Sequence, residues 1–248
     1  MAKAFAGYAD PGNGPVPVLY GKEWDSPLEK AGGPYPFSPA KAMALLKAHG
    51  WKVVPNGTDT CADPGTGPAQ CGAGITAGEP LQFQLLFASG TTSTDEQNAA
   101  VQSSEAAGGV KINLKSEPWN TLVATTGTCN AQSHPAATCD DWQLQQYGYN
   151  PYLPDPSGAG MFNTDAINNY GGYSSPEMDS LINATEYGSS SAAFYAYEDY
   201  AAEQLPILWL PDPSNVFVYK SNLAGVTPLN PFSALLNPEV WYFTKPAS

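Results

Sequence analysis

Aromatic and amide side chains are concentrated in one segment near the middle of the chain. Tyrosine rings stack on flat ligand surfaces, and hydroxyl and carboxamide groups make hydrogen bonds without the shifted pKa values that catalysis needs. The segment therefore predicts a ligand-binding site, with an ordinary tyrosine-rich loop as the alternative. Its candidate residues are Tyr147, Tyr149, Asn150, Tyr152 and Asp155.

Residues that could catalyse a reaction are sparse. The sequence has none of the motifs G-x-S-x-G, H-E-x-x-H, G-x-G-x-x-G or the P-loop, and His49 and His134 are its two histidines. Asp140 and Asp141 are adjacent, so on a strand their side chains would point to opposite faces. We predict a binding module and not an enzyme, with no cofactor and no metal. A secreted carbohydrate-acting hydrolase stays open as the alternative, because two distant carboxylates can form a glycosidase site.

The four cysteines form two pairs with identical spacing. Cys61 and Cys71 enclose ADPGTGPAQ, and Cys129 and Cys139 enclose NAQSHPAAT. Both enclosed segments read as loops, so we predict a local disulfide in each pair, with a zinc site as the alternative. Disulfides indicate an oxidising compartment, and we expect an extracytoplasmic location, periplasmic or attached to the cell surface.

The charge of the chain excludes several classes of partner. The net charge is −13, and all ten basic residues are lysine. Such a surface repels nucleic acid and anionic membranes, and without arginine it offers no bidentate clamp for carboxylate or phosphate. We expect no membrane span, because no apolar run reaches 18 residues. The amino terminus, MAKAFAGYADPG, is not a signal peptide, so an exported protein would be present here as a trimmed chain or fragment.

A strand, a helix and a second strand follow one another over residues 81–115. Alternating apolar residues predict strands over 81–87 and 110–115. An acidic first turn and a Gly-Gly stop predict a helix over 94–107. This order is a βαβ unit, so the two strands should be parallel with a right-handed crossover.

The remaining elements complete a mixed α/β fold, a sheet with flanking helices. Gly- and Pro-rich residues 1–38 are predicted to be an extended surface segment. Ser-Pro pairs predict helix starts at Pro39 and Pro176. A third strand, over 142–149, would carry the tyrosine-rich segment at its end, where ligands bind in α/β sheets. Further helices are expected over 118–125 and 189–205, and further strands over 51–54, 207–210 and 216–219.

The order of these segments resembles the peptide/nickel-type family 5 of extracellular solute-binding proteins, which serve ABC importers. No single motif decides the match, but seven occur in the family's order along most of the chain. They are AFAGYADPGNGPVP, SPAKAMALLKAHGW, EPLQFQLLF with the helix over 94–107, GGVKINLKSEPWNTL, QLQQYGYNPYLPDP, NNYGGYSSPEMDSLINAT and the ending from LPILWLP to VYKSNLAGVTPLNP.

The resemblance implies one lobe of a type II periplasmic-binding-protein-like (cluster C) fold. Residues 1–248 would form a single carboxy-terminal lobe, with an α/β core over 39–220 and a return segment over 221–248 toward a missing amino-terminal lobe. The implied partners are that lobe, an ABC permease and a small-molecule or peptide ligand enclosed by closure of the two lobes.

Matched by position, Trp119 and Tyr149 are similar to aromatic residues that line the family's cleft. Gln146 lies where oligopeptide receptors carry a basic residue for the ligand carboxylate. Tyr152 replaces the aspartate that holds a peptide's amino terminus, and its loss favours an oligosaccharide or another uncharged ligand over a free peptide. An isolated fragment without ligand affinity is the remaining alternative.

Overall fold

The structure, a computed structural model, describes most of the chain. The described residues are 5–17, 24–127, 129, 139, 141–147, 157–188, 190–214, 217–226, 228–230 and 235–244. Four predicted site residues, Tyr149, Asn150, Tyr152 and Asp155, lie outside this part, as does His134.

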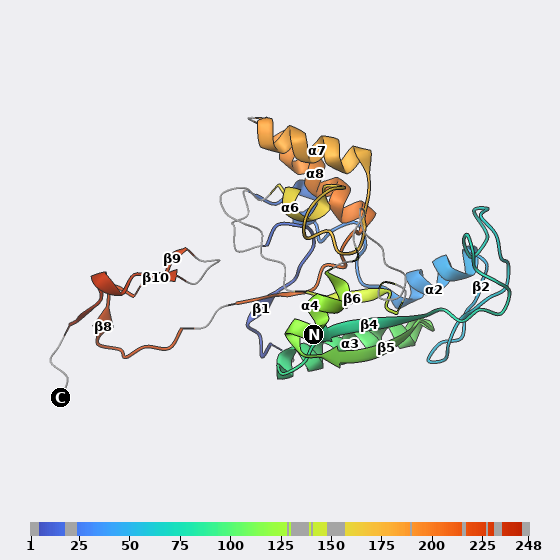
Figure 1. Cartoon of the computed structure of the whole chain (residues 1–248), viewed down its shortest axis with the longest axis horizontal. Helices are drawn as coiled ribbons and strands as arrows, with labels where there is room; N and C mark the ends of the chain where they lie inside the picture. Colours follow the sequence, from blue (N-terminus) through green and yellow to red (C-terminus); the bar gives the residue numbers. More distant parts are fainter. Residues whose placement is uncertain are drawn as a thin grey trace.

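A three-stranded parallel sheet forms one half of the body (Figure 1). Its strands are β4 (Gln82–Ala88), β5 (Lys111–Glu117) and β6 (Leu144–Gln146), in the order β5-β4-β6. Helix α3 (Thr92–Gly108) connects β4 to β5, so the predicted βαβ unit with parallel strands is confirmed. The central strand β4 contains the continuous apolar run LLF, as expected for a strand covered on both faces. The predicted third strand is confirmed over 144–146.

Helix α4 (Trp119–Thr126) packs against β4 and completes what we call the sheet unit, namely β4, β5, β6, α3 and α4. A disulfide joins Cys129 and Cys139, whose Cα atoms lie 5.6 Å apart, and it contributes to the core of this unit. The buried core residues are Leu86, Leu122, Cys129, Cys139 and Trp142.

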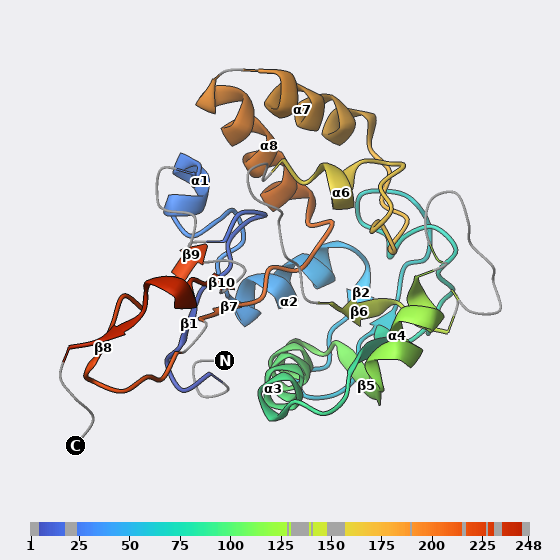
Figure 2. The same cartoon turned by 60° about the vertical axis from the view of Figure 1, so that its left-hand side comes forward.

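A second core lies in the helical unit, which consists of α6 (Ala159–Phe162), α7 (Pro176–Tyr187) and α8 (Ser191–Gln204). Figure 2 shows this unit above the sheet unit. The predicted start of α7 is confirmed, because the Ser175 hydroxyl accepts a hydrogen bond from the Met178 amide and proline occupies the first turn. The buried core residues are Val16, Phe162, Met178, Ile182, Phe194, Tyr197 and Ala201.

Part of the amino-terminal segment is buried, so the prediction that residues 1–38 form only a surface segment is wrong. Val16 belongs to the core of the helical unit, and α1 (Pro27–Lys30) packs against α8. Strand β1 (Ala9–Asp10) pairs with β7 (Asp212–Pro213) in antiparallel fashion. Glycine and proline keep the regular elements short in this segment, but they do not prevent burial of the apolar residues between them.

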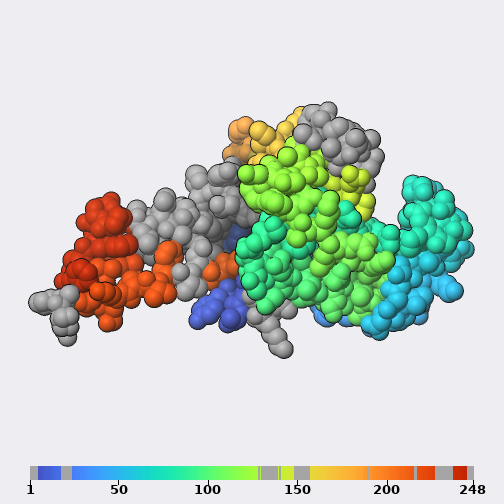
Figure 3. Space-filling view, turned by 60° about the horizontal axis from the view of Figure 1, so that its bottom comes forward, coloured from blue at the N-terminus to red at the C-terminus, as the bar shows by residue number. Residues whose placement is uncertain are grey.

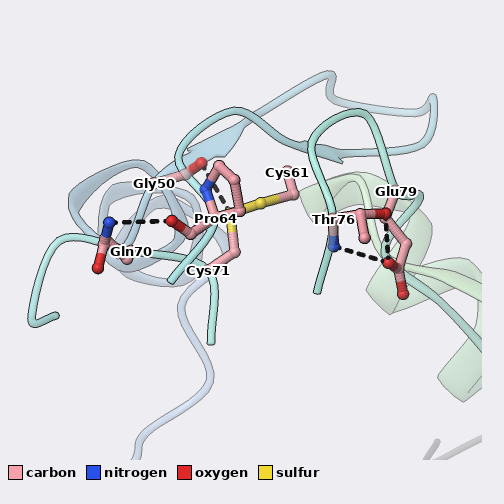
Figure 4. The surroundings of a disulfide bond; sticks show 7 residues. All are labelled: Gly50, Cys61, Pro64, Gln70, Cys71, Thr76 and Glu79. Atoms are coloured by element: carbon pink, nitrogen blue, oxygen red, sulfur yellow. Dashed lines mark hydrogen bonds between the residues drawn. A yellow bond between two sulfur atoms is a disulfide. The ribbon is translucent and has the colours of Figure 1, made fainter. Parts of the chain in front are cut away.

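A disulfide-bonded loop follows helix α2 (Pro39–Ala48), which begins at the predicted Ser38 cap. Strand β2 (Trp51–Lys52) pairs with β3 (Thr60–Cys61), and Cys61 is joined to Cys71 with their Cα atoms 5.8 Å apart. The Gln70 side chain donates to the Pro64 carbonyl on one side of the bridge (Figure 4). Both predicted disulfides are therefore confirmed.

The carboxy-terminal strands lie apart from both units (Figure 3). They form two-stranded antiparallel pairs. The elements are β8 (Leu223–Ala224), β9 (Pro228–Asn230), β10 (Leu235–Leu236), η2 (Pro238–Val240) and β11 (Tyr242–Phe243), with β8 paired to β11 and β9 to β10.

Two predicted strands are wrong where the structure describes them. Residues 207–210 and 217–219 are not strands. Ile207 and Trp209 instead pack as irregular chain against the core of the helical unit, which explains their apolar character. Among the described residues, no helix combines the length and the apolar character needed to cross a bilayer.

Candidate ligand-binding groove

A groove of about 1900 Å³ lies between the sheet unit and the helical unit. Strands β4, β5 and β6 run in parallel, so their carboxyl ends meet at one edge, and the residues that follow them line the groove. Thr91 follows β4, Trp119 follows β5 and Tyr147 follows β6. The edge that sequence analysis proposed for ligand binding is thus the edge that opens into the groove.

Three aromatic side chains form a row along this wall. The ring centroids of Trp119 and Tyr147 are 5.3 Å apart at an interplanar angle of 67°, and those of Tyr147 and Tyr170 are 5.2 Å apart at 39°. Trp119 keeps 50% of its surface exposed. The row therefore holds its rings in place while leaving an indole surface available for stacking.

A partly buried hydrogen bond fixes the central ring of the row. The Tyr147 and Thr126 hydroxyl oxygens are 2.7 Å apart, and the Thr126 hydroxyl also donates to the Leu122 carbonyl at 2.8 Å. Because threonine has a single hydroxyl hydrogen, Tyr147 is the donor when both bonds are made. Burial raises the pKa of Tyr147, so the phenol stays neutral.

Three carboxamides lie beside the row, where α3 begins and β6 ends. Asn98 Nδ2 donates to Gln146 Oε1, and Gln146 Nε2 donates to Gln97 Oε1, each at 2.6 Å. All three residues line the groove, and Gln97 and Asn98 are buried to within a few per cent of their surface. We call this chain the amide relay. It gives the groove a polar floor without a formal charge.

The opposite wall comes from the helical unit and from residues 205–214. Phe162 and Trp209 meet edge to face there, with centroids 6.2 Å apart. Asp212 is the one ionisable carboxyl among the described lining residues, and no lysine or histidine is present among them. Burial, with a smaller contribution from the nearby Asp10, raises the pKa of Asp212 to about 6.

The groove contains all the predicted ligand-binding residues that the structure describes. Trp119, Gln146 and Tyr147 lie together on one wall. Gln97, Asn98 and Tyr170 also line the groove, and they were not predicted from the sequence. Gln97 and Asn98 lie within a predicted helix, where polar residues are commonplace, and Tyr170 lies in a separate turn-rich segment, so no local pattern marked them as neighbours of Tyr147.

Three of the solved structures of similar fold are described as oligopeptide-binding proteins. The protein AppA from Bacillus subtilis, in complex with a nonapeptide, is 21% identical with a TM-score of 0.70, covering 98% of this chain and 44% of that chain. The protein from Thermus thermophilus, complexed with a pentapeptide, is 17% identical with a TM-score of 0.66, covering 90% and 36%. The mannohexaose-bound protein from Thermotoga maritima is 14% identical with a TM-score of 0.65, covering 85% and 38%.

These likenesses confirm the predicted mixed α/β fold as part of the oligopeptide-binding protein fold. The chain spans less than half the length of each of these three proteins. No curated protein matches the sequence significantly. Residues 1–170 match the family described as bacterial extracellular solute-binding proteins, family 5 Middle, which is more than half of the chain. The chain therefore belongs to the family 5 bacterial extracellular solute-binding proteins.

Proposed function

We propose that this chain is the ligand-contacting lobe of a binding protein for an ABC importer and that it binds an extended, uncharged ligand. The observation that carries the proposal is the groove at the carboxyl edge of the sheet, where an aromatic row and an amide relay adjoin. Family 5 is a family of solute-binding proteins, which agrees with the prediction of a binding module and not an enzyme.

An oligosaccharide is the ligand class that this chemistry favours. Aromatic faces stack on the apolar faces of sugar rings, and carboxamides exchange hydrogen bonds with hydroxyl groups without requiring a counter-charge. The described lining has no cation to pair with a carboxylate or phosphate. A related protein of the same fold is mannohexaose-bound, so the fold is compatible with such a ligand.

A peptide is the second candidate, and Asp212 is the observation that favours it. Its carboxyl lines the groove, and a carboxylate there would pair with a ligand ammonium group. Peptide carbonyl and amide groups would use the relay as sugar hydroxyl groups do. The two related structures with bound peptides support this alternative.

The proposal includes a second lobe. Residues 1–248 would act as one jaw, the remainder of a longer protein would supply the other, and residues 221–248 would return toward it. The position of β8–β11 apart from both units supports this arrangement. The two disulfides support an extracytoplasmic location. Handover of the ligand to a permease would complete the function.

Calorimetry on the 248-residue chain with both disulfides formed tests the proposal. Mannohexaose and an end-blocked oligoalanine peptide are titrated separately, and the mixtures are then analysed for cleavage products. Saturable heat with intact probe is the expected result. Cleavage of mannohexaose would support a hydrolase instead. Absence of heat with both probes would identify a lobe without ligand affinity of its own and would refute the proposal for this chain.

A further inference from the structure

The amide relay has a defined direction. It starts at the Thr94 carbonyl oxygen, which accepts from Asn98 Nδ2 at 3.0 Å. The same nitrogen donates to Gln146 Oε1, and Gln146 Nε2 donates to Gln97 Oε1. Asn98 therefore donates to both of its partners, the Thr94 carbonyl and Gln146, and Gln146 in turn donates to Gln97.

This direction cannot be reversed by turning the carboxamides over. A backbone carbonyl only accepts hydrogen bonds, so the NH2 group of Asn98 must face Thr94. Its second hydrogen then requires the oxygen of Gln146, and the NH2 group of Gln146 in turn requires the oxygen of Gln97. The fixed carbonyl thereby sets the orientation of all three side chains.

The relay ends on the NH2 group of Gln97. Among the described residues, Gln97 Oε1 has a partner and Gln97 Nε2 has none. Gln97 has 4% of its surface exposed and lines the groove. An acceptor atom of a ligand in the groove can therefore take a hydrogen bond from Gln97 Nε2.

We propose that Gln97 is a specificity-determining residue that donates from Nε2 to a carbonyl or hydroxyl oxygen of the ligand. Gln146 is then a positioning residue that orients Gln97, because the Gln146 oxygen and nitrogen are both engaged within the relay. This inference rests on the proposed function and adds which partner donates the hydrogen bond. At Gln97 the groove donates, so it selects a ligand that has an acceptor there.

The substitution Gln146→Glu reverses the polarity of the site without changing the size of the side chain. A carboxylate only accepts, so Glu at this position would accept from Asn98 Nδ2 and also from Gln97 Nε2. Gln97 must then turn over and present its oxygen to the groove. The variant should therefore disfavour the ligand acceptors that the wild-type chain binds.

NMR of the side-chain amide groups in the full chain shows directly whether the Gln97 NH2 group faces the groove or Gln146. In the wild type, the Gln97 NH2 hydrogens should exchange with water rapidly, and added mannohexaose should shift and slow them. In Gln146→Glu they should be protected before any probe is added. Fast exchange of Gln97 in this variant would overturn the positioning role of Gln146.

Binding measurements test the contact itself. Gln97→Leu should weaken binding of mannohexaose, or of the end-blocked oligoalanine peptide, about three- to tenfold, as expected for one neutral hydrogen bond. Gln82→Leu is the matched control on β4, because Gln82 is exposed and lies outside the groove. If the wild type binds and Gln97→Leu binds equally well, the inference fails and the proposed function stands. If the wild type binds neither probe, both fail together.

Discussion

The carboxyl groups of Glu29 on α1 and Glu198 on α8 are both buried where these two helices pack against each other. Burial is the main cause that raises the pKa of both, to about 7 for Glu29 and about 10 for Glu198. Asp25 and Asp199 add repulsion. Lys30, the residue after Glu29, lies over the Tyr195 ring, with its Nζ 5.7 Å from the ring centroid. At a pH between about 4.5 and 7, the two folded carboxyl groups therefore keep protons that the same groups release in the unfolded chain.

The stability of the folded chain should therefore fall as the pH rises. In the unfolded chain both carboxyls titrate near 4.5, so above that pH the folded state binds more protons than the unfolded state. The stabilisation is complete below about 4.5. The stabilising contribution of Glu29 is lost as the pH rises to about 7, and the contribution of Glu198 continues to be lost above pH 7. The slope is at most about 1.4 kcal/mol per pH unit for each group.

Urea unfolding at pH 5, 6, 7 and 8 measures this effect. Glu198→Gln is the matched control, because the amide keeps the size of the side chain but cannot ionise. Its stability should depend less on pH than that of the wild type. A free energy of unfolding that increases from pH 5 to pH 8 in the wild type would contradict the assignment.

Removing the Tyr147 hydroxyl should destabilise the aromatic row. Tyr147→Phe keeps the ring contacts with Trp119 and Tyr170 but loses the bond to Thr126, so it should cost about 0.5–1.5 kcal/mol of unfolding free energy. Urea unfolding measures the change. Tyr187→Phe is the control, since Tyr187 is 86% exposed, and it should leave stability unchanged. Equal stability of both variants would show that the bond contributes nothing.

Truncating Trp119 should weaken binding more than it weakens folding. Its indole is half exposed, so little core is lost, while the stacking surface of the groove is removed. We expect Trp119→Ala to raise the dissociation constant for mannohexaose about tenfold, or roughly 1.4 kcal/mol. Tyr242→Ala, an exposed aromatic on β11 outside the groove, should bind like the wild type. Unchanged affinity in Trp119→Ala would remove this residue from the site.

The two disulfides provide a matched comparison of stability. Each closes a loop with a sequence separation of 10, so the chain-entropy contribution, about 2–3 kcal/mol, is the same for both. Cys129 and Cys139 are both buried in the core of the sheet unit, whereas Cys71 is partly exposed. Replacing Cys129 and Cys139 by alanine should therefore cost more than replacing Cys61 and Cys71. Urea unfolding of the two double variants measures the two losses of free energy. A larger loss for the Cys61 and Cys71 variant would contradict the prediction.

Gly158 should not tolerate a side chain. Its φ of 73° is in the left-handed region, and an added Cβ would collide with the Tyr197 hydroxyl and the Phe162 ring. Gly158→Ala should therefore lower the unfolding free energy by more than about 1 kcal/mol. Gly160→Ala, two residues later in α6, meets open space and should be neutral or stabilising. Thermal unfolding compares the two variants, and an equal effect would refute the steric argument.

Local signals in the sequence were sufficient to predict most of the helices and strands that surround the groove. Ser-Pro pairs set the starts of α2 and α7, alternating and helical patterns gave the βαβ unit, and the cysteine spacing gave both disulfides. The sequence also placed Trp119 after one predicted strand and Tyr147 near the carboxyl end of another, and the groove opens at that edge. These signals act over a few residues, because capping, side-chain periodicity and short loop closure depend on neighbours in the chain.

Which distant segments share the groove depends on how the whole chain packs. Gln97, Gln146 and Tyr170 come from α3, the end of β6 and a later turn, and packing of the sheet unit and the helical unit against the rest of the chain brings them to one wall. The same packing buried Val16 and Glu29 and left residues 207–210 without strand partners. Such contacts depend on the shapes of whole surfaces that meet only in the folded chain, so no pattern within one segment could have specified them.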